Sequence, residues 1–399
     1  MTTQAPALAS TPTSGSATVA KPTQRLLSLD VARGVTIAFM IMVNNNGGPG
    51  SWRFMNHAMW NGLTPTDLVF PTFVFVVGIS VVFATAARLA RGASRAQLAR
   101  HTIQRAVILI LFGMVVNGFP YFHLAHFRFY GVLQRIGICY LVVGLFYLWD
   151  QRVSTKIAAL VASLVGYWVL VRWVPIPGVG TPGRDVPFMD MSQNLVSWID
   201  RHLFPYHLYL YSPDHNVRDP EGLLSDLPAI GTALMGMLTG LWLRTSRSNA
   251  VKAAGLAAAC VCSLAVGYLW SLEFPLNKNM WTSSFVLVAG GYSLLLLTFC
   301  FMTIDLQGWR KGWIFPWIVF GSNAIAAYMV SELLPGILDN INVTSATGKR
   351  ISLETAIFDN VFAHIADPHW AAFGYSVSFT AVCFIPVWIL YRKKIFLKV

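Results

Sequence analysis

Residues 67–87 of this 399-residue chain read DLVFPTFVFVVGISVVFATAA, and no charged residue follows Asp67 within that stretch. About 20 consecutive apolar residues are enough to cross the ~30 Å hydrocarbon layer of a membrane as a helix. An irregular backbone could not cross there, because its N–H and C=O groups would find no water to bond. The stretch therefore predicts a membrane-spanning helix.

Composition extends this prediction to the whole chain. Hydrophobic residues make up 55% of it and charged residues only 12%, about half of the ~25% that is usual in a soluble domain. A soluble fold is therefore excluded, and we predict an all-α membrane bundle of about ten transmembrane helices that form a single domain over residues 25–399. The apolar runs cover approximately residues 27–43, 67–87, 106–118, 132–149, 157–174, 223–243, 251–274, 281–302, 313–334 and 370–391.

The formal net charge of +12 indicates how the chain is oriented in the membrane and does not indicate nucleic-acid binding, because the basic residues are scattered over short loops. Residues 88–105 hold five arginines and no acid, and residues 392–398 hold four more cations. Cytoplasmic loops are enriched in Lys and Arg, so both termini are expected in the cytoplasm. We expect a disordered cytoplasmic tail over residues 1–24, an external loop over 175–222 and an external amphipathic segment over 335–369.

Polar side chains gather at the predicted outer ends of the helices, where ionisable groups are costly and therefore functional candidates. The first outer connection, residues 44–62, is rich in amides and glycine and contains His57. Two plainer readings stay open: His57 could be a surface histidine, and Asp67, Arg135 and Glu332 could form a structural ion-pair network. The other polar residues at this depth are Asn117, Gln134, Lys278 and Asn279.

At the predicted inner end, Asp30 and Arg33 lie one helical turn apart, so their side chains would meet. This pair could be purely structural, or Arg33 could present its guanidinium to a phosphate at the cytoplasmic mouth. All five cysteines fall within apolar runs, where a free thiol behaves as a small hydrophobe. We therefore expect neither a disulfide framework nor a metal site.

Several motifs go beyond what composition explains. They are LDVARG (29–34), HAMWNGLTPTDLVFP (57–71), GVLQRI (131–136), DPEGLLS (219–225), LNKNMWTSS (276–284) and GSNA (321–324). This set resembles the transmembrane heparan-alpha-glucosaminide N-acetyltransferase family and its bacterial relatives, over nearly the whole chain after residue 25. The opening Asp-x-x-Arg-Gly also resembles a wider acyltransferase group, which has a histidine where Asn44 stands here.

The resemblance implies a donor and an acceptor on opposite sides of the membrane. Acetyl-CoA would come from the cytosol, and the acceptor would be the amine of an external glucosamine-type sugar, in a bacterial inner membrane. His57 matches the catalytic histidine of the family, and either Asn44 or Asn46 matches a family asparagine. Surrounding lipid and a homodimer are the other partners that the resemblance implies, and no nucleic acid is expected.

This chemistry suits the residues. An amine that attacks a thioester must lose a proton, so an imidazole can serve as general base, and the developing oxyanion needs an amide or cationic donor. Alternatively, His57 could carry the acetyl group transiently, and in either case Asp67 would orient it. We expect CoA to contact Arg33, Asp30, Arg135 and Gln134. We expect the acceptor to contact Asn61, Lys278, Asn279, Trp281 and Glu332.

Two other functions fit the same features. A transporter of N-acetylglucosamine would also use about ten helices and an outward polar pocket. An O-acyltransferase of an envelope glycan would use the same donor. Uptake measured without acetyl-CoA would identify a transporter, and the product's linkage, amide or ester, would separate the two transferases.

Overall fold

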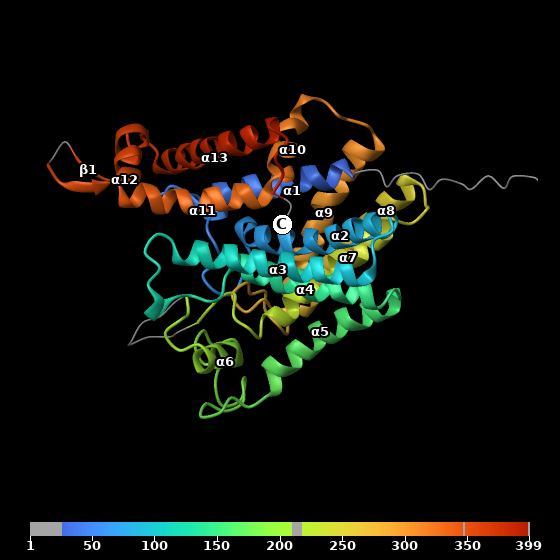
Figure 1. Cartoon of the computed structure of the whole chain (residues 1–399). Coiled ribbons are helices and arrows are strands. Elements are labelled where there is room, and N and C mark those ends of the chain that lie inside the picture. The colour runs from blue at the N-terminus through green and yellow to red at the C-terminus, as the bar shows by residue number, and fades with distance from the viewer. Residues whose placement is uncertain (1–25, 210–217, 346–347, 398–399) are drawn as a thin grey trace, which may run out of the picture.

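The computed structural model describes residues 26–209, 218–345 and 348–397. Within these residues the chain is an all-α bundle, as the composition predicts (Figure 1). Nine described helices are long and apolar enough to cross a membrane, and one bent helix pair raises this number to as many as ten. The protein is therefore a multi-pass membrane protein. The tail expected over residues 1–24 lies outside the described residues.

Most spans begin and end within a few residues of the apolar runs, except α3, which begins 11 residues earlier than its run. They are α1 (Leu27–Asn44), α2 (Val69–Leu89), α3 (Arg95–Gly118), α4 (Val132–Trp149), α5 (Val153–Trp173), α7 (Asp226–Leu243), α8 (Asn249–Trp270), α9 (Ser283–Cys300) and α13 (Pro368–Arg392). A 3-10 turn, η2 (Pro65–Leu68), precedes α2, and a π-helical turn, η4 (Phe301–Leu306), extends α9. The shorter helices are α6 (Leu195–Leu203), α10 (Phe315–Ser322), α11 (Ala324–Asn340) and α12 (Leu353–Ile357).

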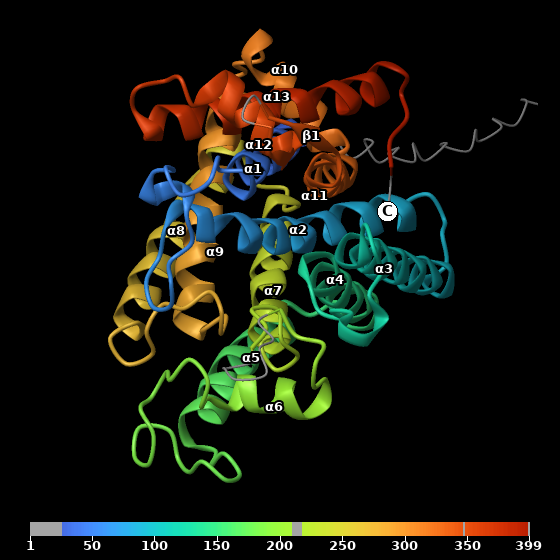
Figure 2. The same ribbon diagram turned by 90° about the vertical axis from the view of Figure 1, so that its left-hand side faces the viewer.

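Helices α2 and α7 form the centre of the bundle. Figure 2 shows α3 and α4 on one side of them and α8 and α9 on the other, with α11 beside α1 and with α10 and α13 beyond α1. Gly78 of α2 and Gly236 of α7 permit the close approach: a Cβ on Gly78 would lie 1.9 Å from the carbonyl oxygen of Ala233, and one on Gly236 would lie 1.8 Å from that of Phe75. Small residues allow such contact between membrane helices, which lack a hydrophobic driving force between them.

The ninth apolar run is not one straight helix. It is divided between α10 and α11, which meet at an angle of 75°. Asn323 lies at the break, where its amide nitrogen donates to the carbonyl oxygen of Ile395 (3.1 Å) and its amide oxygen accepts from the backbone N–H of Leu397 (3.0 Å). A broken span is tolerated where protein groups satisfy the freed backbone, and here the C-terminal segment packs against the break.

The segment predicted to be amphipathic, residues 335–369, has mixed structure. It begins as the end of α11, continues as a hairpin of β1 (Asn342–Thr344) and β2 (Arg350–Ser352), and then forms α12 and a π-helical turn, η6 (Phe358–Phe362). Helical structure in this segment is therefore confined to the end of α11 and to residues 353–362. The external loop expected over residues 175–222 contains the short helix α6 (Figure 1).

Candidate active site

His57 and Asp67 form a hydrogen-bonded pair next to the start of α2. The Nδ1 atom of His57 lies 2.7 Å from Oδ1 of Asp67. The imidazole is 49% exposed, whereas the carboxylate is 1% exposed. Because a carboxylate only accepts hydrogen bonds, this contact places the imidazole proton on Nδ1 and leaves Nε2 able to accept one.

The local sequence TPTD, residues 64–67, explains why Asp67 points at His57. It forms a capping box in which Thr64 and Asp67 bond each other, with Pro65 at the first position of the turn. Oδ2 of Asp67 accepts from the Thr64 N–H (2.9 Å), the Thr64 hydroxyl (3.0 Å) and the Ala58 N–H (3.1 Å). These bonds fix the carboxylate, so the imidazole is oriented before any substrate arrives.

Lys278 comes to the same imidazole from the connection between α8 and α9. Its Nζ atom lies 3.2 Å from both Nδ1 and Nε2 of His57. Burial lowers the pKa of Lys278 below its ordinary value, although the carboxylates of Glu221 and Asp67 oppose that shift. The site thus holds a carboxylate, an imidazole and an amine in contact.

Asn277 fastens the loop that carries Lys278 to the loop that carries His57. Its amide nitrogen donates to Oδ1 of Asn61 (3.0 Å), and its amide oxygen accepts from the N–H of Met280 (2.9 Å). The N–H of Gly62 donates to the carbonyl oxygen of Leu276 (2.8 Å). Asn61, expected to bind the acceptor, is therefore bonded to this loop, and Asn279 follows Lys278 directly.

The two candidate asparagines have different partners. The amide nitrogen of Asn44, at the end of α1, donates to Oε1 of Glu332 on α11 (3.0 Å). The amide of Asn46 bonds instead to the amide oxygen of Asn56 (2.9 Å) and to the N–H of Gly48 (3.1 Å), within its own loop. Asn46 therefore shapes the loop beside His57, whereas Asn44 bridges two spans.

Arg135 and Trp281 lie in the protein interior and pack against each other. The guanidinium lies 4.9 Å from the centre of the Trp281 ring, and its Nε donates to Oδ1 of Asp226 (2.8 Å). Other bonds reach the carbonyl oxygens of Pro220 (3.2 Å) and Gly222 (3.0 Å). The indole N–H of Trp281 donates to Thr232 (3.1 Å). Both side chains are almost completely buried, so they support the site from within.

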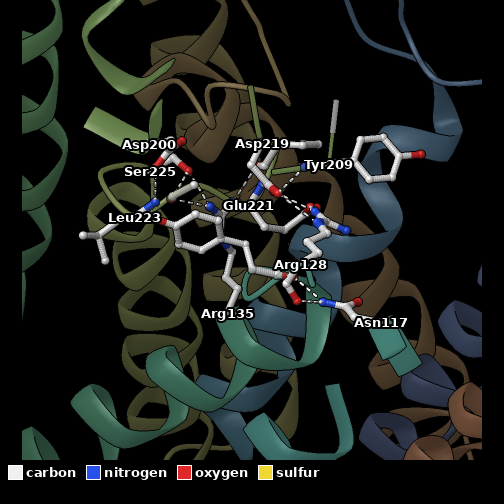
Figure 3. Close-up of polar contacts among 12 residues, drawn as sticks. Asn117, Arg128, Arg135, Asp200, Tyr209, Asp219, Glu221, Leu223 and Ser225 are labelled. Carbon is white, nitrogen blue, oxygen red and sulfur yellow. Dashed lines mark hydrogen bonds and ion pairs between the residues drawn. The ribbon is translucent and has the colours of Figure 1, made fainter. Parts of the chain in front are cut away.

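An ion-pair cluster centred on Arg128, which the sequence did not predict, lies near Arg135 (Figure 3). Arg128 forms two bonds to Asp219, from Nε (2.8 Å) and Nη2 (2.6 Å), and a further bond to Glu221. Burial alone would raise the pKa of Glu221, but the positive charges of Arg128, Arg135 and Lys278 outweigh it and hold the pKa below its ordinary value. Asp219 and Glu221 belong to the DPEG motif, and that motif was the only signal in the sequence.

At the opposite end of the bundle, Arg33 lines a cavity of about 360 Å³ that lies between α1, α2, α3, α4, α10 and α11. Its guanidinium bonds to Asp30 (3.3 Å), Ser80 (2.9 Å) and the carbonyl oxygen of Gly321 (3.2 Å). Along α2 the cavity reaches from Arg88 to Phe73, which is about 22 Å at the helical rise of ~1.5 Å per residue. Its Phe73 end lies about 10 Å along the chain from Asp67.

Two features of this cavity favour a ligand that has phosphate groups and an apolar arm. Arg33, Arg88 and Arg105 all line the cavity, and most of its other lining residues are apolar. Within the described part of the chain, the buried Nε of Arg105 has no hydrogen-bond partner. Both amide atoms of Gln134 are also unbonded, but this side chain packs against Gly113 and does not line the cavity, so the contact expected between Gln134 and CoA is not supported. Buried polar atoms are rarely left unbonded, so such atoms call for a ligand or water.

The predicted site residues thus fall into separate places. His57, Asp67 and Lys278 meet at one end, Asn44 and Glu332 pair with each other, and Asp30 and Arg33 meet at the cavity end. Arg135, expected beside CoA, lies instead with Asp226 and Trp281. Among residues 26–209, 218–345 and 348–397, no three or more His, Cys, Asp or Glu side chains lie together as potential metal ligands.

Comparison with known proteins agrees with these motifs. The family model described as heparan-alpha-glucosaminide N-acetyltransferase, catalytic, matches residues 25–274. The human heparan-alpha-glucosaminide N-acetyltransferase is 28% identical over 422 residues, and the mouse protein of that name is 27% identical over the same length. The alignments cover 94% of this chain but only 60% of each relative. The chain therefore belongs to the heparan-alpha-glucosaminide N-acetyltransferase family of membrane N-acetyltransferases.

Proposed function

We propose that this protein moves the acetyl group of cytosolic acetyl-CoA to the amine of an external glucosamine-type sugar, with His57 at the point of transfer. The observation that carries this proposal is the His57–Asp67 pair, 2.7 Å apart, which lies beyond the Phe73 end of the cavity, whereas Arg33, Arg88 and Arg105 line its other end. Asp67 holds the proton on Nδ1, so Nε2 is the nitrogen that can take a proton from an amine.

The transfer step has two possible routes from this geometry. In the first, Nε2 removes a proton from the sugar amine, the amine nitrogen bonds to the acetyl carbon, the carbon–sulfur bond breaks, and the CoA thiolate leaves and is protonated. In the second, Nε2 bonds to the acetyl carbon, the carbon–sulfur bond breaks and the CoA thiolate leaves and is protonated. His57 then carries the acetyl group until the amine nitrogen displaces the imidazole and loses its proton. In both, Asp67 stabilises the charged imidazole, and an amide donor stabilises the oxyanion. Asn46, in the loop that carries His57, and Asn44, held by Glu332, are the two candidates for that donor.

The cavity is where we place the donor. Arg33, Arg88 and Arg105 would hold the CoA phosphates through charge-assisted bonds, with Asp30 orienting Arg33. The apolar walls suit the thin pantetheine arm, and the unbonded Nε of Arg105 offers a further donor to the phosphates. We place the phosphate end on the cytoplasmic side, together with both termini, in a bacterial inner membrane. Arg135 positions the segment from Pro220 to Asp226 and does not contact the phosphates in this proposal.

The acceptor would bind at the His57 end. Lys278 contacts the imidazole, and Asn61 belongs to the loop that is bonded to the Lys278 loop. We propose that these residues, Asn279 and Glu332 contact the sugar. Trp281 contributes by packing behind this region rather than by stacking on the sugar, because its ring is completely buried. We propose an amino sugar of the cell envelope as the natural acceptor.

Purified protein in lipid nanodiscs tests the proposal. With acetyl-CoA and glucosamine, we expect release of free CoA and formation of an N-acetyl amide, which mass spectrometry distinguishes from an ester. The His57→Ala variant should lose at least about 100-fold in rate, whereas His123→Ala, an exposed histidine in the connection before α4, should keep it. Unchanged turnover in His57→Ala would remove His57 from the mechanism. Uptake of labelled N-acetylglucosamine into proteoliposomes without acetyl-CoA would identify a transporter instead.

A further inference from the structure

Lys278 occupies the position that an acceptor amine needs. A general base must lie within about 2.6–3.2 Å of the group whose proton it takes. The Nζ atom of Lys278 lies 3.2 Å from Nε2 of His57 and is itself a primary amine. Any acetyl carbon that is held for attack by an amine beside Nε2, or is bonded to Nε2, is therefore also within reach of Lys278.

The surroundings of Lys278 support reactivity. Its side chain is only partly exposed, and burial lowers the pKa of its amine, against the opposing charges of Glu221 and Asp67. The loop that carries it is fixed by the bonds of Asn277 to Asn61 and Met280, so Nζ is held beside the imidazole. Fixed proximity of this kind raises reaction rates by many orders of magnitude relative to free amines in solution.

We propose that Lys278 is a self-acetylation site, which accepts the acetyl group when no sugar occupies the acceptor position. This inference rests on the proposed function. His57 takes one proton from the Lys278 ammonium, Nζ bonds to the acetyl carbon, and the carbon–sulfur bond breaks. CoA leaves as a thiolate that is protonated, and the net products are Nε-acetyl-Lys278, CoA and one proton.

Acetylation of Lys278 has two consequences for the enzyme. It removes a positive charge that interacts with Glu221 and Asp67, and it places an acetamide against the imidazole. The acceptor amine needs the same position beside Nε2, so a bound sugar protects Lys278. The enzyme therefore loses activity when it is exposed to acetyl-CoA alone and keeps it while acceptor is present.

The experiment uses the full-length protein in nanodiscs with acetyl-CoA labelled with carbon-13 in its acetyl group and no sugar. Mass spectrometry follows the label at Lys278 and at Lys349, an exposed lysine of the β1–β2 hairpin that reports non-enzymatic acetylation. We expect label at Lys278 to exceed that at Lys349 by at least about tenfold. Saturating glucosamine should suppress it, and His57→Gln should reduce it by about 100-fold without changing Lys349.

The Lys278→Arg variant keeps a cation but offers a far weaker nucleophile, so it separates acetylation from other causes of inactivation. Wild-type protein should lose activity during preincubation with acetyl-CoA in step with the label, whereas Lys278→Arg should keep whatever activity it has at the start. Equal labelling of Lys278 and Lys349, or labelling that His57→Gln does not reduce, overturns the inference.

The outcomes also separate this inference from the proposed function. If glucosamine is acetylated but Lys278 is not, the inference fails and the proposed function stands. If Lys278 is acetylated but glucosamine is not, the inference stands and the acceptor assignment fails. If neither is acetylated, both fail.

Discussion

Replacing Asp67 with Asn tests the site most sharply, because the structure determines which way the amide must turn. Oδ2 of Asp67 accepts three bonds, from Thr64 N–H, Thr64 hydroxyl and Ala58 N–H, at 2.9–3.1 Å. An asparagine keeps these only if its oxygen takes the Oδ2 position, which leaves its NH₂ group facing Nδ1 of His57. Nδ1 must then accept, so the imidazole proton moves to Nε2.

The size of the effect follows from this change of tautomer. With its proton on Nε2, His57 can neither deprotonate an amine nor attack a thioester at that atom. The equivalent Asp-to-Asn change in a serine protease triad costs ~10⁴-fold in kcat, and we expect ~10³–10⁴-fold here, which is ~4–5.5 kcal/mol of activation free energy. The KM for glucosamine should change little. Weaker capping should lower the free energy of unfolding by about 1–2 kcal/mol.

The assay measures free CoA by thiol detection over a series of glucosamine concentrations, with thermal unfolding as the test of folding. Asp359→Asn, an exposed aspartate in η6, is the matched control and should behave as wild type. If folded Asp67→Asn keeps more than about one tenth of the wild-type kcat, then tautomer control by Asp67 is refuted.

Three further predictions follow from the structure. Arg105→Gln should raise the KM for acetyl-CoA about 10–100-fold, because it removes a charged contact to phosphate. Arg95→Gln, exposed at the start of α3, should leave that KM unchanged. Equal KM values in both variants would refute the placement of the donor in the cavity. Burial raises the pKa of Asp200 to about 7, helped by the charge of Asp219 although the N–H of Leu223 opposes it. The folded state then binds the proton more tightly than the unfolded state, so stability falls as the pH rises from about 4 to 7. Asp200→Asn should therefore raise Tm at pH ~8, where it adds on the order of 2–4 kcal/mol to the free energy of unfolding, and should change Tm little at pH ~4. An equal gain at both pH values contradicts this prediction. Gly236→Ala should lower Tm, because its Cβ would lie 1.8 Å from a backbone oxygen and would reduce the free energy of unfolding by about 1–3 kcal/mol. Gly166→Ala, whose Cβ would have no atom within 4 Å, should leave Tm unchanged or raise it. Equal changes in Tm for the two variants would refute the close packing of α2 on α7.

The contact between Lys278 and His57 bears on the two possible routes. If His57 carries the acetyl group as an acyl-imidazole, Lys278 lies beside a reactive carbon for the whole lifetime of that species. Direct transfer exposes the acetyl carbon to Lys278 only while acetyl-CoA is bound without acceptor. Detection of labelled His57 before labelled Lys278 in a rapid-quench time course would favour the acyl-imidazole route.

The sequence by itself determined the membrane fold. A span must be apolar over its whole length because lipid cannot bond the backbone, and that requirement is local, so α4 (Val132–Trp149) coincides with its apolar run. The family could also be predicted from the sequence, because its motifs, such as HAMWNGLTPTDLVFP, lie within short stretches of the chain. Asp67 could be linked to His57 in advance because only ten residues separate them.

Tertiary structure decided which distant side chains meet. Lys278 reaches His57 across 221 residues, and Arg128 reaches Asp219 across 91. Arg135 and Trp281 point into the interior, although their motifs predicted ligand contacts. Apolarity places a residue at a depth in the membrane but does not fix the rotation of its helix or its neighbours. Those depend on side-chain packing between helices, such as the close approach of α2 and α7 at Gly78 and Gly236, and therefore only the assembled bundle specifies them.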